Sequence, residues 1–193
     1  MLSMRMGGCN ILIANPRDMP DFLKVLGSAP FTAIIGVNTL FRAMLDAPGF
    51  AAIDLKPLKL AVAGGMAVQQ VVAQRWKQRA GVPLVEGYGL TETAAPSHSN
   101  PPDAPKQQCL GVPYMSTDAR VVDPTTLRPC AVGEVGEIMI HGPQVFKGYW
   151  NNPEATAHAL QNGWLLTGDM GSMDADGFLT LRDRSKDVII SGG

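Results

Sequence analysis

The sequence predicts an α/β fold: a parallel sheet with flanking helices, followed by a smaller antiparallel β-barrel-like subdomain. Two observations support this prediction. In the first half of the chain, short apolar runs alternate with segments of helical periodicity, which is typical of strand–helix–strand units. From Leu110 onward the apolar runs are short and separated by turn residues, which favours antiparallel pairing. We therefore expect an α/β part over residues 1–105 and a β-barrel-like part over residues 106–183.

In the first half, expected strands alternate with expected helices. The strands span 10–14, 31–37, 58–63 and 83–85, and the helices span 19–26, 38–45 and 67–80. Asp18 and Asn38 stand at the starts of two helices, where a side-chain oxygen can accept hydrogen bonds from first-turn N–H groups. Gly81 stands where a left-handed glycine ends a helix. These caps define the expected helix limits.

The second half is punctuated by turns. Residues 96–108 are rich in proline and show no periodicity, so they are expected to form a loop or linker. The strands expected after it span 118–122, 136–141, 163–166, 177–182 and 187–190. One short helix is expected directly after Asn152 and Pro153.

Composition excludes several classes of protein. Charged residues make up 17% of the 193 residues and the net charge is −1, so nucleic acid is not an expected partner. No apolar run approaches the roughly 18–20 residues that span a bilayer. The cysteines at positions 9, 109 and 130 are widely spaced, which favours free thiols in a reducing cytosol over a metal or disulfide site.

The segment 86–92 (EGYGLTE) holds the densest set of candidate binding groups. Its two glycines let the backbone turn sharply and approach a flat ligand, and Tyr88 offers a face for stacking. Thr91 offers a hydroxyl to a phosphate oxygen, and Glu92 offers a hard carboxylate oxygen to Mg²⁺. Taken alone, the same pattern also fits a glycine-rich turn with a capping threonine.

Three weaker motifs accompany this segment. Gly64 and Gly65 end an expected strand, where a ligand can lie against the backbone. Asp169 ends the tripeptide 167–169 (TGD), and its carboxylate can accept two hydrogen bonds from a cis-diol such as ribose. The charge run 182–187 can bring an arginine to nucleotide oxygens. Each motif alone also fits an ordinary turn. The histidines show no metal-like spacing and are expected to be surface or structural residues.

The order and spacing of these motifs resemble the adenylate-forming superfamily, which holds acyl-CoA synthetases, luciferases and peptide-synthetase adenylation domains. The resemblance covers essentially the whole chain and is nearest to bacterial long-chain fatty acyl-CoA synthetases. The segments that carry it are 64–65, 88–92, 133–137, 148–150, 167–169 and 183–187.

The resemblance implies a set of nucleotide contacts. Tyr88 would stack on adenine, Asp169 would take the ribose hydroxyls, and Arg184 would assist at the ribose. The full set of implied contacts is Gly64, Gly65, Met66, Glu86, Gly87, Tyr88, Gly89, Thr91, Asp169 and Arg184.

The resemblance also implies catalytic roles. Thr91 would contact the phosphate, Glu92 would hold Mg²⁺, and Lys186 would match the hinge of a C-terminal domain that begins within 184–193. The implied substrates are ATP, a fatty acid and coenzyme A, which give acyl-CoA, AMP and pyrophosphate through an acyl adenylate.

The family's phosphate loop and its adenylation lysine are not among these residues, so the chain is expected to be an internal fragment that is inactive alone. Two alternatives stay open: a non-catalytic nucleotide- or acyl-binding remnant, and a ligase for a medium-chain or aromatic acid. The expected location is cytoplasmic, with peripheral contact at the inner membrane left open, and the oligomeric state is not fixed.

Overall fold

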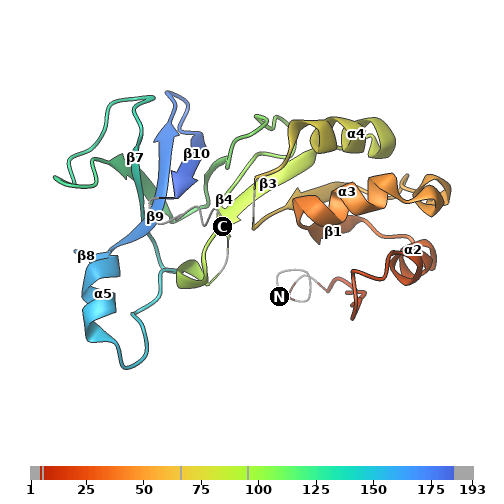
Figure 1. Cartoon of the computed structure of the whole chain (residues 1–193), viewed down its shortest axis with the longest axis horizontal. Helices are drawn as coiled ribbons and strands as arrows, with labels where there is room; N and C mark the ends of the chain where they lie inside the picture. Colours follow the sequence, from red (N-terminus) through yellow and green to blue (C-terminus); the bar gives the residue numbers. More distant parts are fainter. Residues whose placement is uncertain (1–4, 6, 66, 95, 185–193) are drawn as a thin grey trace, which may run out of the picture.

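The chain forms two β-sheets, one covered by helices and one almost free of them (Figure 1). The computed structural model describes residues 5, 7–65, 67–94 and 96–184. The predicted architecture, a helix-covered parallel sheet followed by an antiparallel barrel-like sheet, is confirmed. Among the described residues, no helix is both long enough and apolar enough to cross a membrane.

The first sheet has the strand order β1-β2-β3-β4-β5. Its strands are β1 (Ala33–Gly36), β2 (Leu60–Ala63), β3 (Leu84–Gly89), β4 (Pro96–Ser99) and β5 (Val112–Pro113). The first three pair in parallel, whereas β4 and β5 pair antiparallel. Strand β3 therefore has a parallel neighbour on one side and an antiparallel neighbour on the other, so the sheet changes character at β3.

Helices cover this sheet and close its core. They are α2 (Met19–Gly27), α3 (Asn38–Asp46), the 3-10 helix η1 (Pro48–Ala52) and α4 (Gln70–Ala80). Trp76 of α4 is fully buried, with its ring 4.8 Å from Phe41 in an edge-on contact and 5.9 Å from Phe50 in a stacked one. Such aromatic contacts add to the stabilisation from buried area. The interior of this half is therefore organised around one tryptophan.

Two predictions for the first half are wrong. Residues 10–14 form no strand, and Ile11 and Leu12 are 48% and 85% exposed. The apolar run lacks a partner strand, because the described sheet ends at β1. Asn38 does not cap its own helix: it is buried, and its Oδ1 accepts a hydrogen bond from the N–H of Gln69 at 3.0 Å. Asn38 thus fixes the start of α4.

Other helix limits agree with the sequence. The Asp18 side chain accepts a hydrogen bond from the N–H of Asp21 at 3.2 Å and caps α2 as predicted. Gly81 ends α4 with a left-handed φ of 75°, also as predicted. The expectation of a loop throughout 96–108 is wrong in part, because 96–99 form strand β4. Its polar sequence gives no strand signal, and its pairing with β3 determines its conformation.

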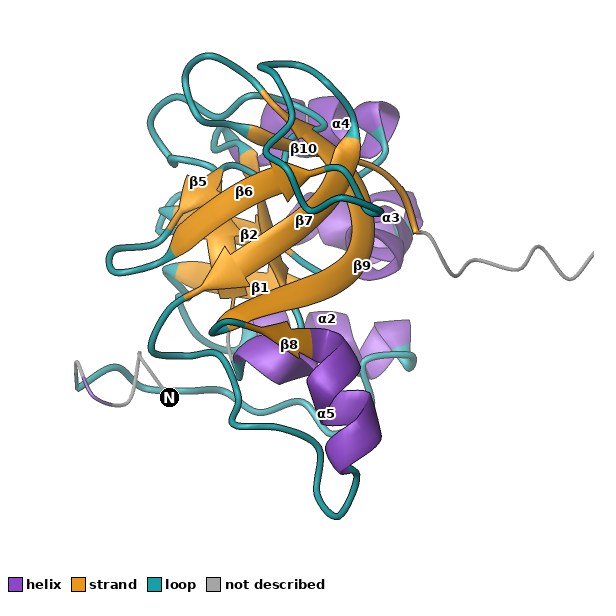
Figure 2. Ribbon diagram, turned by 90° about the vertical axis from the view of Figure 1, so that its left-hand side faces the viewer, coloured by secondary structure: helices purple, strands orange, loops and turns teal. Residues whose placement is uncertain are grey.

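The second sheet is antiparallel, with the order β10-β9-β7-β6 (Figure 2). Its elements are β6 (Asp118–Val122), β7 (Gly136–His141), α5 (Pro153–Ala159), β8 (Leu160–Gln161), β9 (Trp164–Met173) and β10 (Leu179–Arg184). Strand β9 is much longer than the predicted 163–166, so the tripeptide 167–169 lies inside a strand and not at its end. The strand predicted over 187–190 lies outside the described residues.

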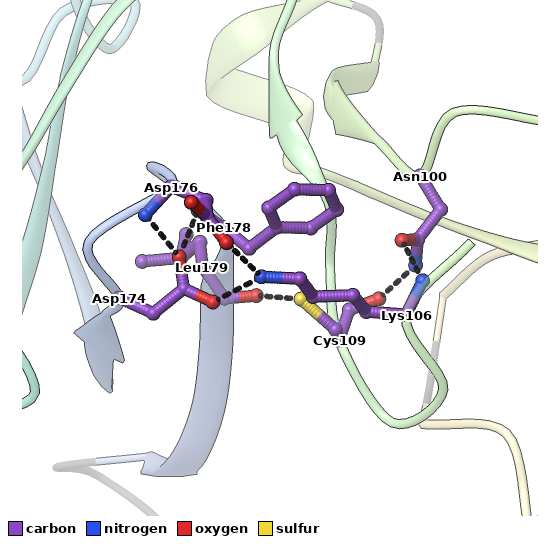
Figure 3. Close-up of polar contacts among 7 residues, drawn as sticks. All are labelled: Asn100, Lys106, Cys109, Asp174, Asp176, Phe178 and Leu179. Carbon is purple, nitrogen blue, oxygen red and sulfur yellow. Dashed lines mark hydrogen bonds and ion pairs between the residues drawn. The ribbon is translucent and has the colours of Figure 1, made fainter. Parts of the chain in front are cut away.

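The segment between β4 and β5 joins the two halves. Figure 3 shows Lys106 Nζ between two carboxylates, 2.6 Å from Asp174 and 2.9 Å from Asp176. The same segment pairs with β10, because the N–H of Leu110 donates to the carbonyl of Leu179 at 2.8 Å. Because β5 pairs with β4, the first sheet continues past residue 105. The division into two subdomains at residue 105 stays a prediction.

Gly111 allows the chain before β5 to pass close to the backbone of Ser99 in β4. It has a φ of 89°, and a Cβ atom there would overlap the backbone of Ser99. Glycine suits this position for two reasons. Other residues rarely adopt this φ, and the position has no room for a side chain.

Candidate functional site

A cleft of about 1180 Å³ opens at the carboxyl ends of β2 and β3. Its opposite wall is strand β9, through Thr167, Gly168 and Asp169. Open α/β sheets bind ligands at the carboxyl ends of their strands, next to a change in strand order. The predicted site residues that line this cleft are Gly64, Gly65, Gly87, Tyr88, Gly89, Thr91, Glu92 and Asp169. Residues 105 positions apart in the sequence (64 and 169) therefore share one cavity.

Glycines make up part of the cleft lining at the ends of β2 and β3, namely Gly64, Gly65, Gly87 and Gly89. A Cβ atom on Gly64 would lie 3.7 Å from the carbonyl oxygen of Gly87, which is an ordinary van der Waals contact. Gly65 has a left-handed φ of 77°, a conformation that glycine adopts readily. This arrangement leaves room for a flat ligand against the main chain.

Tyr88 and Asp169 connect the two halves of the chain across this cleft. The Tyr88 hydroxyl donates a hydrogen bond to Asp169 Oδ2 at 2.6 Å. Both side chains are almost fully buried, at 7% and 2% exposure. The tyrosine ring packs in the core of the second sheet with Leu110 and Ile138, although Tyr88 belongs to the first sheet. Stacking of Tyr88 on adenine stays a prediction.

Glu92 is held by a loop of the second half. The Tyr149 hydroxyl donates to Glu92 Oε1 at 2.7 Å, and the N–H of Phe146 donates to the carbonyl of Glu92 at 2.8 Å. The hydrogen bond to the carboxylate raises the pKa of the Tyr149 phenol. Sequence reasoning gave Tyr149 no role, and its only signal was its place in the motif 148–150.

Glu86 turns away from the cleft. Its carboxylate accepts hydrogen bonds from the N–H of Gln108 at 2.9 Å and of Val68 at 3.3 Å. Burial raises its pKa although these hydrogen bonds oppose the shift. The side chain lines a separate cavity of about 210 Å³, next to Lys106. The structure therefore gives Glu86 a part in holding loops together, and its nucleotide contact stays a prediction.

A further cavity, of about 650 Å³, lies on the other side of Glu92 from the large cleft. It shares Leu90, Glu92, Thr167 and Gly168 with the first cleft, and Tyr149 and Glu137 are among its other lining residues. Glu137 Oε1 accepts a hydrogen bond from the N–H of Gly168 at 2.9 Å, which fixes the backbone beside Asp169. Glu137 is thus a further residue that sequence reasoning left without a role.

Three predicted residues are described in part or not at all. Met66 and Lys186 lie outside the described residues, and of Arg184 only the backbone is described. In the pairing of β10 with β9, Arg184 is the register partner of Asp169. The backbone therefore brings the two predicted ribose contacts to neighbouring positions.

The acidic residues fit magnesium only in a limited way. The described part of the chain holds no group of three or more His, Cys, Asp or Glu that could bind a metal ion. Glu92 offers one carboxylate beside the exposed Thr91. Magnesium often uses one or two carboxylates and takes its other ligands from substrate phosphates and water. The single Glu92 carboxylate therefore fits an ion that arrives with a triphosphate.

His98 lies behind the cleft and is fully buried. It pairs with Tyr88 across β4 and β3, with the two rings 5.8 Å apart. Its Nδ1 lies 2.9 Å from the Ser97 hydroxyl, and among the described residues its Nε2 has no hydrogen-bond partner. Burial lowers the pKa of His98 to about 4. The predicted structural role of this histidine agrees with its position.

Comparison with known proteins identifies relatives in one family. Residues 1–150 match the family model described as AMP-binding enzyme. A long-chain-fatty-acid–CoA ligase of Escherichia coli O157:H7 is 47% identical over 194 residues, which cover 100% of this chain and 34% of the relative. A feruloyl-CoA synthase of Amycolatopsis is 38% identical over 189 residues, which cover 96% of this chain and 38% of the relative. The chain spans about a third of the length of the curated relatives it matches.

Solved structures show the same fold. An anthranilate CoA ligase in complex with anthranoyl-AMP superposes with a TM-score of 0.86 at 27% identity, over 93% of this chain and 35% of that one. O-succinylbenzoate coenzyme A synthetase of Bacillus subtilis, in complex with ATP and magnesium ion, gives a TM-score of 0.76 at 31% identity, over 91% of this chain and 36% of that one.

Proposed function

This chain belongs to the family of AMP-binding enzymes, and on that premise we propose that its larger cleft is one wall of an ATP site. The observation that carries the proposal is the convergence on one cleft of two strand ends and strand β9. The glycine-lined ends of β2 and β3 suit a flat adenine ring. The buried Asp169 carboxylate suits the ribose hydroxyls, because it accepts hydrogen bonds.

We propose that the whole protein is a long-chain fatty acid–CoA ligase. The reaction is the attack of a fatty-acid carboxylate on the α-phosphate of ATP, which releases pyrophosphate and gives an acyl adenylate. The thiol of coenzyme A then displaces AMP. The support for this substrate is the 47% identity to a relative that bears this name. Cytoplasmic location and peripheral contact with the inner membrane stay predictions from the same resemblance.

The residues of this chain have a limited part in that reaction. In the first step two anionic groups must approach each other, so positioned donors and neutralised charge matter more than covalent help. Thr91 is exposed at the cleft and offers its hydroxyl to a phosphate oxygen. Glu92 would hold Mg²⁺, which when bound would neutralise charge on the phosphate oxygens.

A second candidate substrate is an aromatic acid. The feruloyl-CoA synthase is 38% identical to this chain, and the ligase bound to anthranoyl-AMP shares its fold. We infer the long-chain acid as the first candidate because its named relative is the more similar of the two. A direct comparison of oleate with ferulate as substrates of the whole protein would decide between them.

The test uses the 193-residue chain itself. We expect AMP to bind with measurable heat in titration calorimetry, because the glycine-lined strand ends and Asp169 are both present. We expect no ATP–pyrophosphate exchange with oleate and Mg²⁺, because the chain spans about a third of its relatives. Absence of AMP binding would contradict the proposed site, and clear exchange would contradict the proposed need for further residues.

A further inference from the structure

Tyr149 reaches Glu92 from a different half of the chain. The contact joins residues 57 positions apart, at 2.7 Å between the hydroxyl and Oε1. Glu92 lines both the large cleft of about 1180 Å³ and the cavity of about 650 Å³, whereas Tyr149 lines the cavity of about 650 Å³ and not the large cleft. The hydroxyl therefore determines toward which cavity one carboxylate oxygen points.

The backbone around Glu92 is already fixed without this hydroxyl. The N–H of Phe146 donates to the carbonyl of Glu92 at 2.8 Å. Thr93 exchanges hydrogen bonds with the backbone of Leu90 at 2.9 Å, which closes the turn. The Tyr149 hydroxyl therefore adds little to the turn itself, and its effect falls on the flexible Glu92 side chain.

The Tyr149 ring is itself held in place. It packs edge-on against Phe146 with ring centroids 4.8 Å apart, and the N–H of Tyr149 donates to Thr156 Oγ1 at 2.9 Å. Neither contact uses the hydroxyl. A phenylalanine at position 149 can therefore keep the ring in place and remove only the hydrogen bond to Glu92.

We propose that Tyr149 is a positioning residue that orients the Glu92 carboxylate toward a magnesium ion carried by the bound nucleotide. The inference rests on the proposed function, because it takes Glu92 as the magnesium contact. A carboxylate that is already oriented loses less rotational freedom when the ion binds. Because Oε1 accepts the hydrogen bond from Tyr149, the Glu92 carboxylate is held in one orientation toward the ion.

The test compares two ligands on four forms of the chain by titration calorimetry: wild type, Tyr149→Phe, Glu92→Gln and the double variant. Tyr149→Phe should weaken MgATP binding by about tenfold, the lower end for a residue that orients a metal ligand. AMP binding in EDTA should change by less than about twofold, because AMP reaches the cleft without the ion. Tyr114→Phe, at a tyrosine that is 47% exposed, is the matched control and should change neither affinity.

The double variant separates positioning from mere structure. If the hydroxyl acts through Glu92, Tyr149→Phe should have no further effect on MgATP binding in the Glu92→Gln background. Equal losses for MgATP and AMP would show a structural role and overturn the inference. Unchanged or tighter MgATP binding in Tyr149→Phe would overturn it as well, because the hydroxyl would then be idle or in competition with the ion. If wild type binds neither ligand, the proposed function fails and this inference fails with it.

Discussion

Replacement of His98 by asparagine should remove much of the acid sensitivity of the fold. Burial lowers the pKa of His98 from 6.5 to about 4. Below pH 6.5 the unfolded chain binds a proton at this position, whereas the folded chain does not. The unfolding free energy therefore decreases as the pH is lowered. The loss is confined to the window between pH 6.5 and 4, and above pH 6.5 both states are neutral.

The magnitude follows from the shift. Each pKa unit is worth 1.36 kcal/mol, so a drop from 6.5 to about 4 gives a total of about 3 kcal/mol. At pH 4.5 most of it, about 2.5 kcal/mol, is already lost. Glu86, whose pKa is raised by burial, changes stability in the opposite direction near its own pKa, where the folded chain binds the proton first. That contribution is common to wild type and variant, and it cancels in their difference.

Urea unfolding followed by tryptophan fluorescence measures the effect at pH 7 and pH 4.5. Asparagine keeps a polar atom near the Ser97 hydroxyl and removes Nε2, which has no hydrogen-bond partner in the described part of the chain. The drop in unfolding free energy between the two pH values should be about 2.5 kcal/mol smaller in His98→Asn than in wild type. His158→Asn, at an exposed position on α5, is the matched control and should behave as wild type. An equal drop in wild type and His98→Asn would refute the reasoning.

Two further predictions concern the fold. Gly111→Ala should abolish soluble folded protein, because its Cβ would overlap the Ser99 backbone. Gly133→Ala has a similar φ of 81°, and its Cβ would meet no atom of the described residues within 4 Å, so it should lower the unfolding free energy by only about 1 kcal/mol, read from urea midpoints. Trp76→Ala should cost about 3–5 kcal/mol because the side chain is fully buried, whereas Trp150→Ala, at 91% exposure, should change stability by less than about 0.5 kcal/mol.

The parallel half was predictable because its signals are local. The strands within 31–37 and 58–63 are dense in apolar residues, and Asp18 and Gly81 mark the start of α2 and the end of α4. Residues 10–14 carry the same signal and form no strand, because strand formation also needs a partner. The predicted capping role of Asn38 was wrong for a related reason. Its side chain accepts a hydrogen bond from the N–H of Gln69, 31 positions away, and not from its own helix. Local chemistry gave no sign of that contact.

The candidate site shows the same division. The glycines and Asp169 were found as motifs. The ends of β2 and β3 meet at one edge of the first sheet, and the long strand β9 brings Asp169 to the opposite wall of the same cleft. Tyr149 was not assigned a role, because no spacing rule connects it to a glutamate 57 positions earlier. Glu86 was assigned to the nucleotide by its place in a motif, and that contact stays a prediction. The motif gave no sign that its carboxylate accepts a hydrogen bond from the N–H of Gln108, 22 positions away.

The packing of Tyr88 has a consequence for how such chains can recombine. Tyr88 is encoded with the first sheet, yet its ring lies in the core of the second and its hydroxyl binds Asp169. A crossover between two related genes near residue 105 would unite a tyrosine from one parent with a core and a carboxylate from the other. Functional chimeras should therefore inherit residues 84–169 as one block, with crossovers tolerated more readily outside it.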